Sequence, residues 1–401
     1  MLSELITTKA EWPTLINDRN LTYFDSAAST QTHTSVLKRM NDYYEKQRCN
    51  VNRGDYNISQ RVSEDIEIAR QSVADILNCE ADNIVFTAGA THGLNMVAEW
   101  NKDAPVVFIT EAEHTANIMP WIVQGRTIDN GRLQVLPLND RGLVNLDEAV
   151  KLFEKYPYSM LSIHSHSNVT GIPTNYKKLT KAAHDYGIKV CIDACQTLGT
   201  HEFDVYTVDY AVFSGHKMYG PTGVGILYGR LGWDTHRAIQ QGGDTINHYD
   251  FKGNVDWKEG PTKHEPGTLN IAGILGLGVA AEYIKWVGYN EIERYMSKMD
   301  LALSDAGLFD IKGLNLLYPN YRQNGRFVYS FRCEGYHPSD LSAMLSLDNI
   351  AVRAGKLCAH PIVNKVSGGK GVLRVSPGIY NNQDDVNNLV EGLCKAVKRL
   401  S

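Results

Sequence analysis

The chain has 401 residues, 43% of them apolar and 21% charged, and a formal net charge of −5 at pH 7. This length suits two or three domains, and the composition is typical of a soluble globular protein. A slightly acidic chain is not expected to bind nucleic acid or an anionic membrane through its overall charge.

The sequence favours a cytoplasmic protein without a membrane segment. Residues 1–6 include Glu4 and lack the basic start and apolar run of a secretory signal. The longest apolar run, 271–281, is shorter than the roughly 18–20 residues of a membrane-spanning helix. Seven cysteines, an odd number scattered along the chain, indicate reduced thiols.

Strand and helix patterns alternate along the first part of the chain. Apolar spacing predicts helices over 35–47 and 58–77. Short apolar segments then predict strands over 84–87, 106–110, 133–136, 160–164, 189–193, 210–213 and 224–228. Between them, helices are expected to begin near residues 90, 114, 145 and 176. This alternation predicts an α/β fold with a mostly parallel sheet covered by helices.

The last part of the chain has a different pattern. Residues 241–268 show little periodicity and many Gly, Asp and His residues, which favours a functional loop or hairpin. Helices are predicted over 274–287, 291–308, 340–347 and 384–400, with strands near 327–332, 350–353 and 372–375. We therefore expect an N-terminal segment (1–20) that packs with a small C-terminal α+β domain (289–401), and a large domain (21–288) between them.

Lys217 lies on a glycine-rich turn between two predicted strands, beside Ser214 and His216 and without a nearby carboxylate. An isolated lysine on a turn is usually a solvated surface residue. Lysine amines in polar turns of this kind can also form Schiff bases with carbonyl compounds, above all with pyridoxal phosphate (PLP). The residues at the ends of the upstream strands are therefore needed to distinguish a surface lysine from a PLP-binding lysine.

Polar residues follow the ends of several predicted strands, where open α/β sheets bind ligands. Backbone amides at Ala90, with the Thr91 hydroxyl, are suited to phosphate. His114 could stack on a flat ring. Asp193 ends an apolar strand and needs a partner, such as a protonated pyridine nitrogen. Gln196 could reach the phenolic oxygen of the same ring.

These motifs resemble a known family when they are taken in order. The order Gly89-Ala90-Thr91, Glu113-His114, Ser167 to Gly171, Asp193 to Gln196 and Ser214 to Pro221 is similar to the class V aminotransferase superfamily of fold-type I PLP enzymes. Within it, the motifs most resemble the Suf-type (SufS/CsdA-like, group II) cysteine desulfurases, from about Tyr23 to the C-terminal helix. The resemblance implies a seven-stranded, mostly parallel sheet sandwiched by helices, and a smaller α+β domain that carries an active-cysteine loop.

The resemblance also implies residue roles. Lys217 would bind PLP as a Schiff base, and His114 would stack on the ring and move protons. The cofactor contacts would be Ala90, Thr91, Ser214 and His216 at the phosphate, Asp193 at the ring nitrogen, Gln196 at the phenolic oxygen, and Asn168 at the cofactor and substrate. Gly267 and Thr268 would complete the phosphate site of a partner subunit, so a homodimer is implied. Arg353 and Arg374, with Asn168, would bind the substrate carboxylate.

The segment from Arg353 to Pro361 resembles the active-cysteine loop, and Cys358 would be its nucleophile. Nearby cations such as Arg353 and Lys356 can lower the pKa of a thiol. The family usually has His before this cysteine and after His114, whereas this chain has Lys356-Leu357 and Thr115. The other cysteines (Cys49, Cys79, Cys191, Cys195, Cys333 and Cys394) are expected to be packing residues, and no metal-ligand set is predicted.

The leading hypothesis is an L-cysteine desulfurase, a PLP-dependent transferase that converts L-cysteine to L-alanine and leaves a persulfide on Cys358. By resemblance, the sulfur would pass to an acceptor protein of the SufE/SufU type for iron–sulfur cluster or thio-cofactor synthesis. L-Selenocysteine would be a second substrate. Two alternatives remain open: another class V aminotransferase or epimerase acting on a different amino acid, and a non-enzymatic scaffold that binds a sulfur-relay partner.

Overall fold

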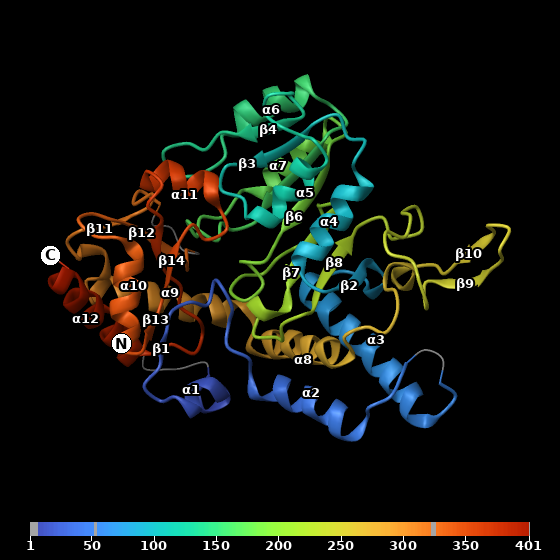
Figure 1. Cartoon of the computed structure of the whole chain (residues 1–401), viewed down its shortest axis with the longest axis horizontal. Helices are drawn as coiled ribbons and strands as arrows, with labels where there is room; N and C mark the ends of the chain where they lie inside the picture. Colours follow the sequence, from blue (N-terminus) through green and yellow to red (C-terminus); the bar gives the residue numbers. More distant parts are fainter. Residues whose placement is uncertain (1–6, 52–53, 322–325, 401) are drawn as a thin grey trace.

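The computed structural model describes residues 7–51, 54–321 and 326–400. Residues 1–6 of the predicted N-terminal segment lie outside these ranges. Figure 1 shows two groups of elements: the large sheet with its helices, and a second group at the left that contains the C-terminal strands and helices. The predicted boundaries at residues 20 and 288 stay predictions.

The large sheet has seven strands in the order β2-β8-β7-β6-β5-β3-β4. Their bounds are β2 (Ile84–Thr87), β3 (Val107–Thr110), β4 (Leu133–Leu136), β5 (Met160–His164), β6 (Lys189–Asp193), β7 (Tyr210–Ser214) and β8 (Gly225–Gly229). β8 runs antiparallel to both neighbours, and the other adjacent strands pair in parallel. The predicted fold class is therefore confirmed.

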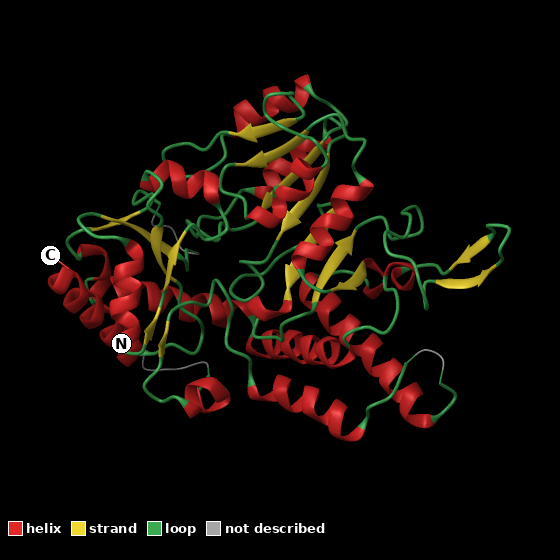
Figure 2. Ribbon diagram, viewed as in Figure 1, coloured by secondary structure: helices red, strands yellow, loops and turns green. Residues whose placement is uncertain are grey.

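Helices cover both faces of this sheet. Successive residues of a strand point to opposite sides, so each strand can pack apolar side chains against helices on both faces. One face, with Phe86 and Phe108, packs in the core that includes α3 (Asn57–Leu77), α6 (Leu146–Lys155), α7 (Tyr176–His184) and α8 (Ile271–Val287). The other face, with Val85 and Val107, packs against α4 (Ala90–Trp100) and α5 (Met119–Val123). α2 (Thr34–Lys46) lies outside and packs on α8 (Figure 2).

The second sheet has four antiparallel strands in the order β11-β12-β15-β14. They are β11 (Leu314–Leu316), β12 (Tyr329–Cys333), β14 (Arg353–Gly355) and β15 (Val372–Val375), with helices α9 (Tyr289–Asp305), α10 (Pro338–Leu347), α11 (His360–Ser367) and α12 (Gln383–Leu400). The N-terminal part joins this group: β1 (Thr22–Tyr23) pairs with β13 (Ile350–Ala351), and Lys9 forms an ion pair with Asp385 at 2.7 Å. The short helix α1 (Pro13–Asn17) precedes β1.

Two predictions of elements were wrong in detail. The helix expected from residue 114 is a 3-10 turn (Thr115–Asn117) followed by the five-residue α5, since Pro120 lies at the start of α5 and Gly125 follows it with φ 77°. The single strand expected over 350–353 is two strands in different sheets, β13 and β14. The segment 241–268 does contain a hairpin, β9 (Ile246–Tyr249) and β10 (Val255–Trp257), which projects at the right of Figure 1.

Among the described residues, no single helix is long and apolar enough to cross a membrane. α8 and α9 reach that length and apolar content only when they are taken together, and their axes are bent by 77° where they meet.

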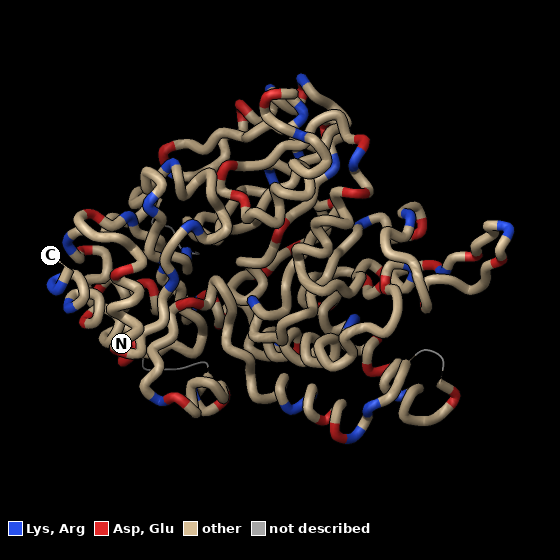
Figure 3. The backbone as a smooth tube through the Cα atoms, viewed as in Figure 1, with Lys and Arg blue, Asp and Glu red and all other residues tan. Residues whose placement is uncertain are grey.

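Charged residues of both signs occur along the chain (Figure 3), and the ion pair between Arg70 and Glu265 is deeply buried. Arg70 of α3 donates to Glu265 through both terminal nitrogens, at 2.6 and 2.9 Å. Arg70 is 1% exposed and Glu265 is 5% exposed. Glu265 also accepts from the backbone N–H of Phe86 at 2.7 Å. The pair therefore ties α3, β2 and the segment after the hairpin together.

We expect Glu265→Ala to lower the free energy of unfolding by about 3–5 kcal/mol, because it leaves the Arg70 guanidinium buried without its main partner. Denaturant unfolding followed by circular dichroism measures this change. The matched control is Asp75→Ala, which removes an exposed partner of Lys285 and should cost about 0–1 kcal/mol. Equal losses in the two variants would contradict the structural role of the buried pair.

Candidate active site

A cavity of about 310 Å³ lies at the carboxyl ends of the central strands. Its lining contains every residue predicted for the site except Gly267 and Thr268: Ala90, Thr91, His114, Asn168, Asp193, Gln196, Ser214, His216, Lys217, Arg353, Cys358 and Arg374. These residues come from both groups of elements, since Arg353, Cys358 and Arg374 belong to the C-terminal part. The cavity therefore depends on how the two groups pack.

One end of the cavity is suited to an anion. Gly89 precedes α4 with φ 144°, a backbone conformation that favours glycine. The N–H of Ala90 at the helix start donates to Ser214 Oγ at 2.9 Å. Burial, with a smaller effect from Lys217, lowers the pKa of His216 to about 4, so its imidazole is neutral at pH 7. A helix N-terminus with hydroxyls beside it favours a phosphate group.

Asp193 and His114 lie on the walls next to Lys217. Asp193 ends β6, is 7% exposed, and accepts the N–H of Cys195 at 3.0 Å. Burial lowers the pKa of His114, and the charges of Lys217 and Arg374 add to this, while Asp193 opposes it. Because His114 Nδ1 accepts the N–H of Ala116 at 3.1 Å, the proton of the neutral ring is on Nε2.

Asp25 binds two arginines of the cavity at once. It accepts from Arg353 Nε and a terminal nitrogen at 3.0 and 2.8 Å, and from Arg374 at 3.0 Å. Arg374 is 2% exposed and also donates to the carbonyl of Asn168 at 2.9 Å. Burial lowers the pKa of Arg374, and Asp25 opposes that change. The Nε–H of Arg374 is buried and has no partner in the described chain, and the residue lines the cavity.

The thiol of Cys358 is exposed at the edge of the cavity, in a strained loop. Leu357 and Cys358 both have φ 53°, in the left-handed region that costs non-glycine residues about 1–2 kcal/mol each. Asn168 Nδ2 donates to the carbonyl of Leu357 at 2.8 Å. Thr115 donates to the carbonyl of Cys358 through its backbone N–H at 2.6 Å and its hydroxyl at 2.7 Å.

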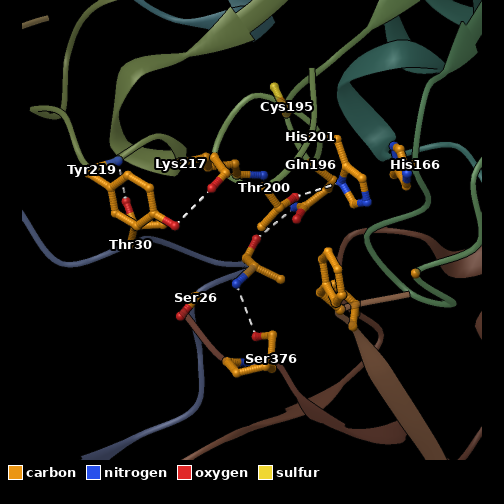
Figure 4. Close-up of a pocket in the computed structure, with 16 residues that line it drawn as sticks. Ser26, Thr30, His166, Cys195, Gln196, Thr200, His201, Lys217, Tyr219 and Ser376 are labelled. Atoms are coloured by element: carbon orange, nitrogen blue, oxygen red, sulfur yellow. Dashed lines mark hydrogen bonds between the residues drawn. The ribbon is translucent and has the colours of Figure 1, made fainter. Parts of the chain in front are cut away.

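A smaller pocket adjoins the cavity and shares Lys217, Cys195, Gln196 and His166 with it (Figure 4). Gln196 Nε2 donates to the carbonyl of Ala27 at 2.7 Å. The rings of His166 and His201 stack with centroids 4.5 Å apart. Lys217 therefore lines both spaces.

Comparison with known proteins identifies the family of the chain. The family model for class V aminotransferases matches residues 22–389. The chain belongs to the class V aminotransferase family. A cysteine desulfurase of Klebsiella pneumoniae (strain 342) is 35% identical over 98% of both chains. A cysteine desulfurase of Synechococcus elongatus is 36% identical over 96% of this chain, which matches 61% of that protein's length.

Solved cysteine desulfurases have the same fold. The enzyme from Thermococcus onnurineus NA1, in its apo form, superposes with a TM-score of 0.90, at 31% identity and 98% coverage of both chains. CsdA from Escherichia coli superposes with a TM-score of 0.87, at 32% identity and 98% coverage of both chains. The chain is therefore similar to cysteine desulfurases in sequence and structure over nearly its full length.

Several features of this class V aminotransferase chain were not predicted from its sequence. Asp25 lies just after β1 and was not among the predicted site residues. The carboxylate of Glu113 is fully buried and binds Thr110, Asn117 and His164. His164 also lines the cavity, and its place at the end of β5 was the available signal.

Other expectations need correction. Lys356 Nζ donates to Asn364 and to the carbonyl of Gly369 at 2.5 Å, so its ammonium is held within the loop region. Arg353 is bound to Asp25 and still lines the cavity together with Cys358, so its predicted role stays a prediction. Cys394 is exposed rather than buried, and Cys195 lines the cavity. Gly267 and Thr268 are exposed and line neither space described above, so their role toward a partner subunit stays a prediction.

The contributions of His164 and His166 to the free energy of unfolding should change with pH in opposite directions. Burial favours neutral His164, but the Glu113 carboxylate on its Nδ1 raises its pKa above the usual value of about 6.5. Its contribution is therefore fully present below about pH 6.5 and is lost as the pH rises through the raised pKa. Burial, together with His201 and His164, holds the pKa of His166 well below the usual value, so its contribution is lost as the pH falls below about 6.5.

The melting temperature measured from pH 5.5 to 8.5 checks this. The difference between wild type and His164→Gln should shrink as the pH rises, and that between wild type and His166→Gln should shrink as the pH falls. Parallel pH profiles for His164→Gln and His166→Gln would contradict the assigned shifts.

Proposed function

We propose that this chain is a PLP-dependent L-cysteine desulfurase in which Cys358 receives the sulfur. The observation that carries the proposal is the meeting of Lys217, Asp193 and an exposed Cys358 thiol at one cavity. The names of the full-length relatives support it, since they are cysteine desulfurases. A scaffold that only binds a partner needs none of these three side chains at one cavity.

The residues of the cavity fit PLP. Lys217 would hold the aldehyde carbon, Asp193 the ring nitrogen, and Gln196 the phenolic oxygen, with His114 at the ring face. Ala90, Thr91, Ser214 and His216 would hold the phosphate at the start of α4. When bound, PLP supplies an electron sink for the charge left on Cα after its proton is removed.

The substrate carboxylate fits the arginine side of the cavity. The free Nε–H of Arg374 offers a charge-assisted hydrogen bond, and Asp25 keeps the guanidinium in one orientation. Asn168 lies beside it, with its amide bound to the Cys358 loop. Substrate binding and the position of the thiol are thus connected through one side chain.

In the proposed reaction, Lys217 carries out the proton transfer and Cys358 carries out the sulfur transfer. Lys217 Nζ removes the α-proton of L-cysteine. The Cys358 thiolate attacks the substrate sulfur, so an S–S bond forms and the Cβ–S bond breaks with its electron pair moving to the substrate carbon. A proton returned to Cβ from Lys217 Nζ or His114 Nε2 gives L-alanine. An acceptor thiolate next attacks the outer sulfur of the persulfide and releases the Cys358 thiolate.

We also propose that the enzyme is a homodimer and that its sulfur goes to an acceptor protein. Thr268 and Gly267 are exposed on the segment after the hairpin, where they are able to reach a second copy. The Cys358 thiol is exposed and therefore open to an acceptor. L-Selenocysteine is the second substrate that we propose, since its C–Se bond is weaker than a C–S bond.

Cys358→Ala should lower alanine formation from L-cysteine by about three orders of magnitude or more, because the nucleophile is lost. The assay uses PLP-loaded protein, L-cysteine and a thiol reductant, with alanine measured by chromatography. Cys394→Ala, which removes another exposed thiol, is the control and should keep wild-type activity. L-Selenocysteine should still be cleaved by Cys358→Ala.

Normal alanine formation by Cys358→Ala would refute the sulfur-transfer role. If wild type formed no alanine but its yellow absorbance shifted with another amino acid, transamination or epimerisation would replace desulfuration.

Thr268→Ala should raise the Kd for PLP by about tenfold or more, since a hydrogen bond to a charged phosphate contributes about 1.5–3 kcal/mol. Titration of PLP into the apoprotein, with sedimentation to measure the oligomeric state, tests this. Thr262→Ala on the same segment is the matched control, because its hydroxyl binds the carbonyl of Glu259. A monomeric wild type with full PLP affinity would refute the shared site.

A further inference from the structure

The active-cysteine loop of this chain is held in a strained shape by contacts from outside the loop. Two consecutive non-glycine residues, Leu357 and Cys358, have φ 53°. Such a backbone persists only where its surroundings determine it. Cys358 is exposed, and contact with water does not hold a backbone in one conformation. The contacts of its two carbonyls and of the Leu357 side chain must do so.

Leu357 anchors one side of the loop. Its side chain is 8% exposed and lies in an apolar cluster with Val169, Ile362 and Val372. Its carbonyl accepts from Asn168 Nδ2 at 2.8 Å. The residue before the thiol is therefore fixed at both its side chain and its backbone.

Thr115 anchors the other side, and its contact is unusual because two donors of one residue meet one acceptor. The Cys358 carbonyl accepts from the Thr115 N–H at 2.6 Å and from its hydroxyl at 2.7 Å. Thr115 also begins the 3-10 turn that His114 precedes, and His114 Nδ1 accepts the N–H of the next residue, Ala116. The same turn thus fixes both the ring in the cavity wall and the backbone of the nucleophile.

We propose that Thr115 is a positioning residue for sulfur transfer: with Leu357, it fixes the strained backbone of Cys358 so that the thiol is set over the cavity before substrate binds. This inference rests on the proposed function and assigns a task to two positions where the resembled family usually has histidine. Thr115 touches neither the substrate nor the cofactor site directly, since it is absent from the cavity lining. Its effect passes through the Cys358 carbonyl, and it should alter the sulfur step without altering binding.

The test uses three variants of the PLP-loaded protein. Thr115→Val keeps the shape and the backbone donor but loses the hydroxyl, and Thr115→Ser keeps the hydroxyl. Thr34→Val is the matched control, because the Thr34 hydroxyl also binds a backbone carbonyl, that of Glu11 at 2.8 Å, away from the site. The absorbance change on adding L-cysteine reports binding, and single-turnover alanine formation reports sulfur transfer.

We expect Thr115→Val to slow alanine formation about five- to tenfold, the effect of one lost hydrogen bond, with the cysteine concentration for half-maximal absorbance change unaltered. Thr115→Ser and Thr34→Val should stay within about twofold of wild type. Equal rates for Thr115→Val and wild type would overturn the proposal. So would a parallel loss in binding and rate, or a failure of Thr115→Ser to restore the rate.

A second measurement does not depend on activity. Amide hydrogen exchange of the apoprotein, read by mass spectrometry, should be about five- to tenfold faster in the peptide that contains residues 356–360 of Thr115→Val than in wild type, and unchanged in Thr34→Val. If exchange rises as expected but wild type forms no alanine, the loop contact is real and the desulfurase function fails. If alanine forms normally in wild type and exchange does not change in Thr115→Val, the positioning role fails and the function stands.

Discussion

The site depends on a carboxylate that holds two guanidinium groups together. Asp25 comes from the chain just after β1, Arg353 from β14 and Arg374 from β15. A nearly buried arginine is costly without a negative partner, so Arg374 requires Asp25, and Asp25 in turn fixes where the N-terminal part meets the small sheet. The isolated bridge between Asp25 and Ser376 keeps the two backbones in register.

This charge cluster also explains why a cavity made from two sheets has a defined shape. Arg374 donates to the carbonyl of Asn168, which belongs to the loop after β5 of the large sheet. Ser330 of β12 donates to the carbonyl of the next residue, Val169, at 2.6 Å. Gly171 lies against the backbone of Val328, where a Cβ would come within 2.4 Å of a carbonyl oxygen. Close packing and paired charge together set the distance between the anion end and the cysteine loop.

The part of the site whose residues follow the ends of neighbouring strands could be predicted from the sequence. Strand–helix alternation puts strand ends at one edge, so Asp193, Ser214 and Lys217 could be expected together, and the motif order identified the family. The sequence was insufficient where a contact joins distant segments. Asp25 and Arg374 are 349 positions apart, and Thr115 and Cys358 are 243 apart, with no periodicity linking either pair. Arg353 and Lys356 were expected beside the thiol because they are its neighbours in sequence. Arg353 does line the cavity with Cys358, but its ion pair with Asp25 could not be foreseen, and Lys356 is bound to the carbonyl of Gly369.

The restraint of the Cys358 loop has a consequence for how sulfur leaves the proposed enzyme. A persulfide on a long mobile loop could travel to a distant acceptor, but here both carbonyls flanking the nucleophile are bound and Leu357 is buried. Releasing these contacts would cost several hydrogen bonds and an apolar anchor, more than is recovered by relaxing two strained residues. The thiol is exposed at that fixed position. In the proposed reaction, an acceptor would therefore have to bring its own thiol to the mouth of the cavity, and the surface around the loop, rather than the reach of the loop, would determine which acceptor is used.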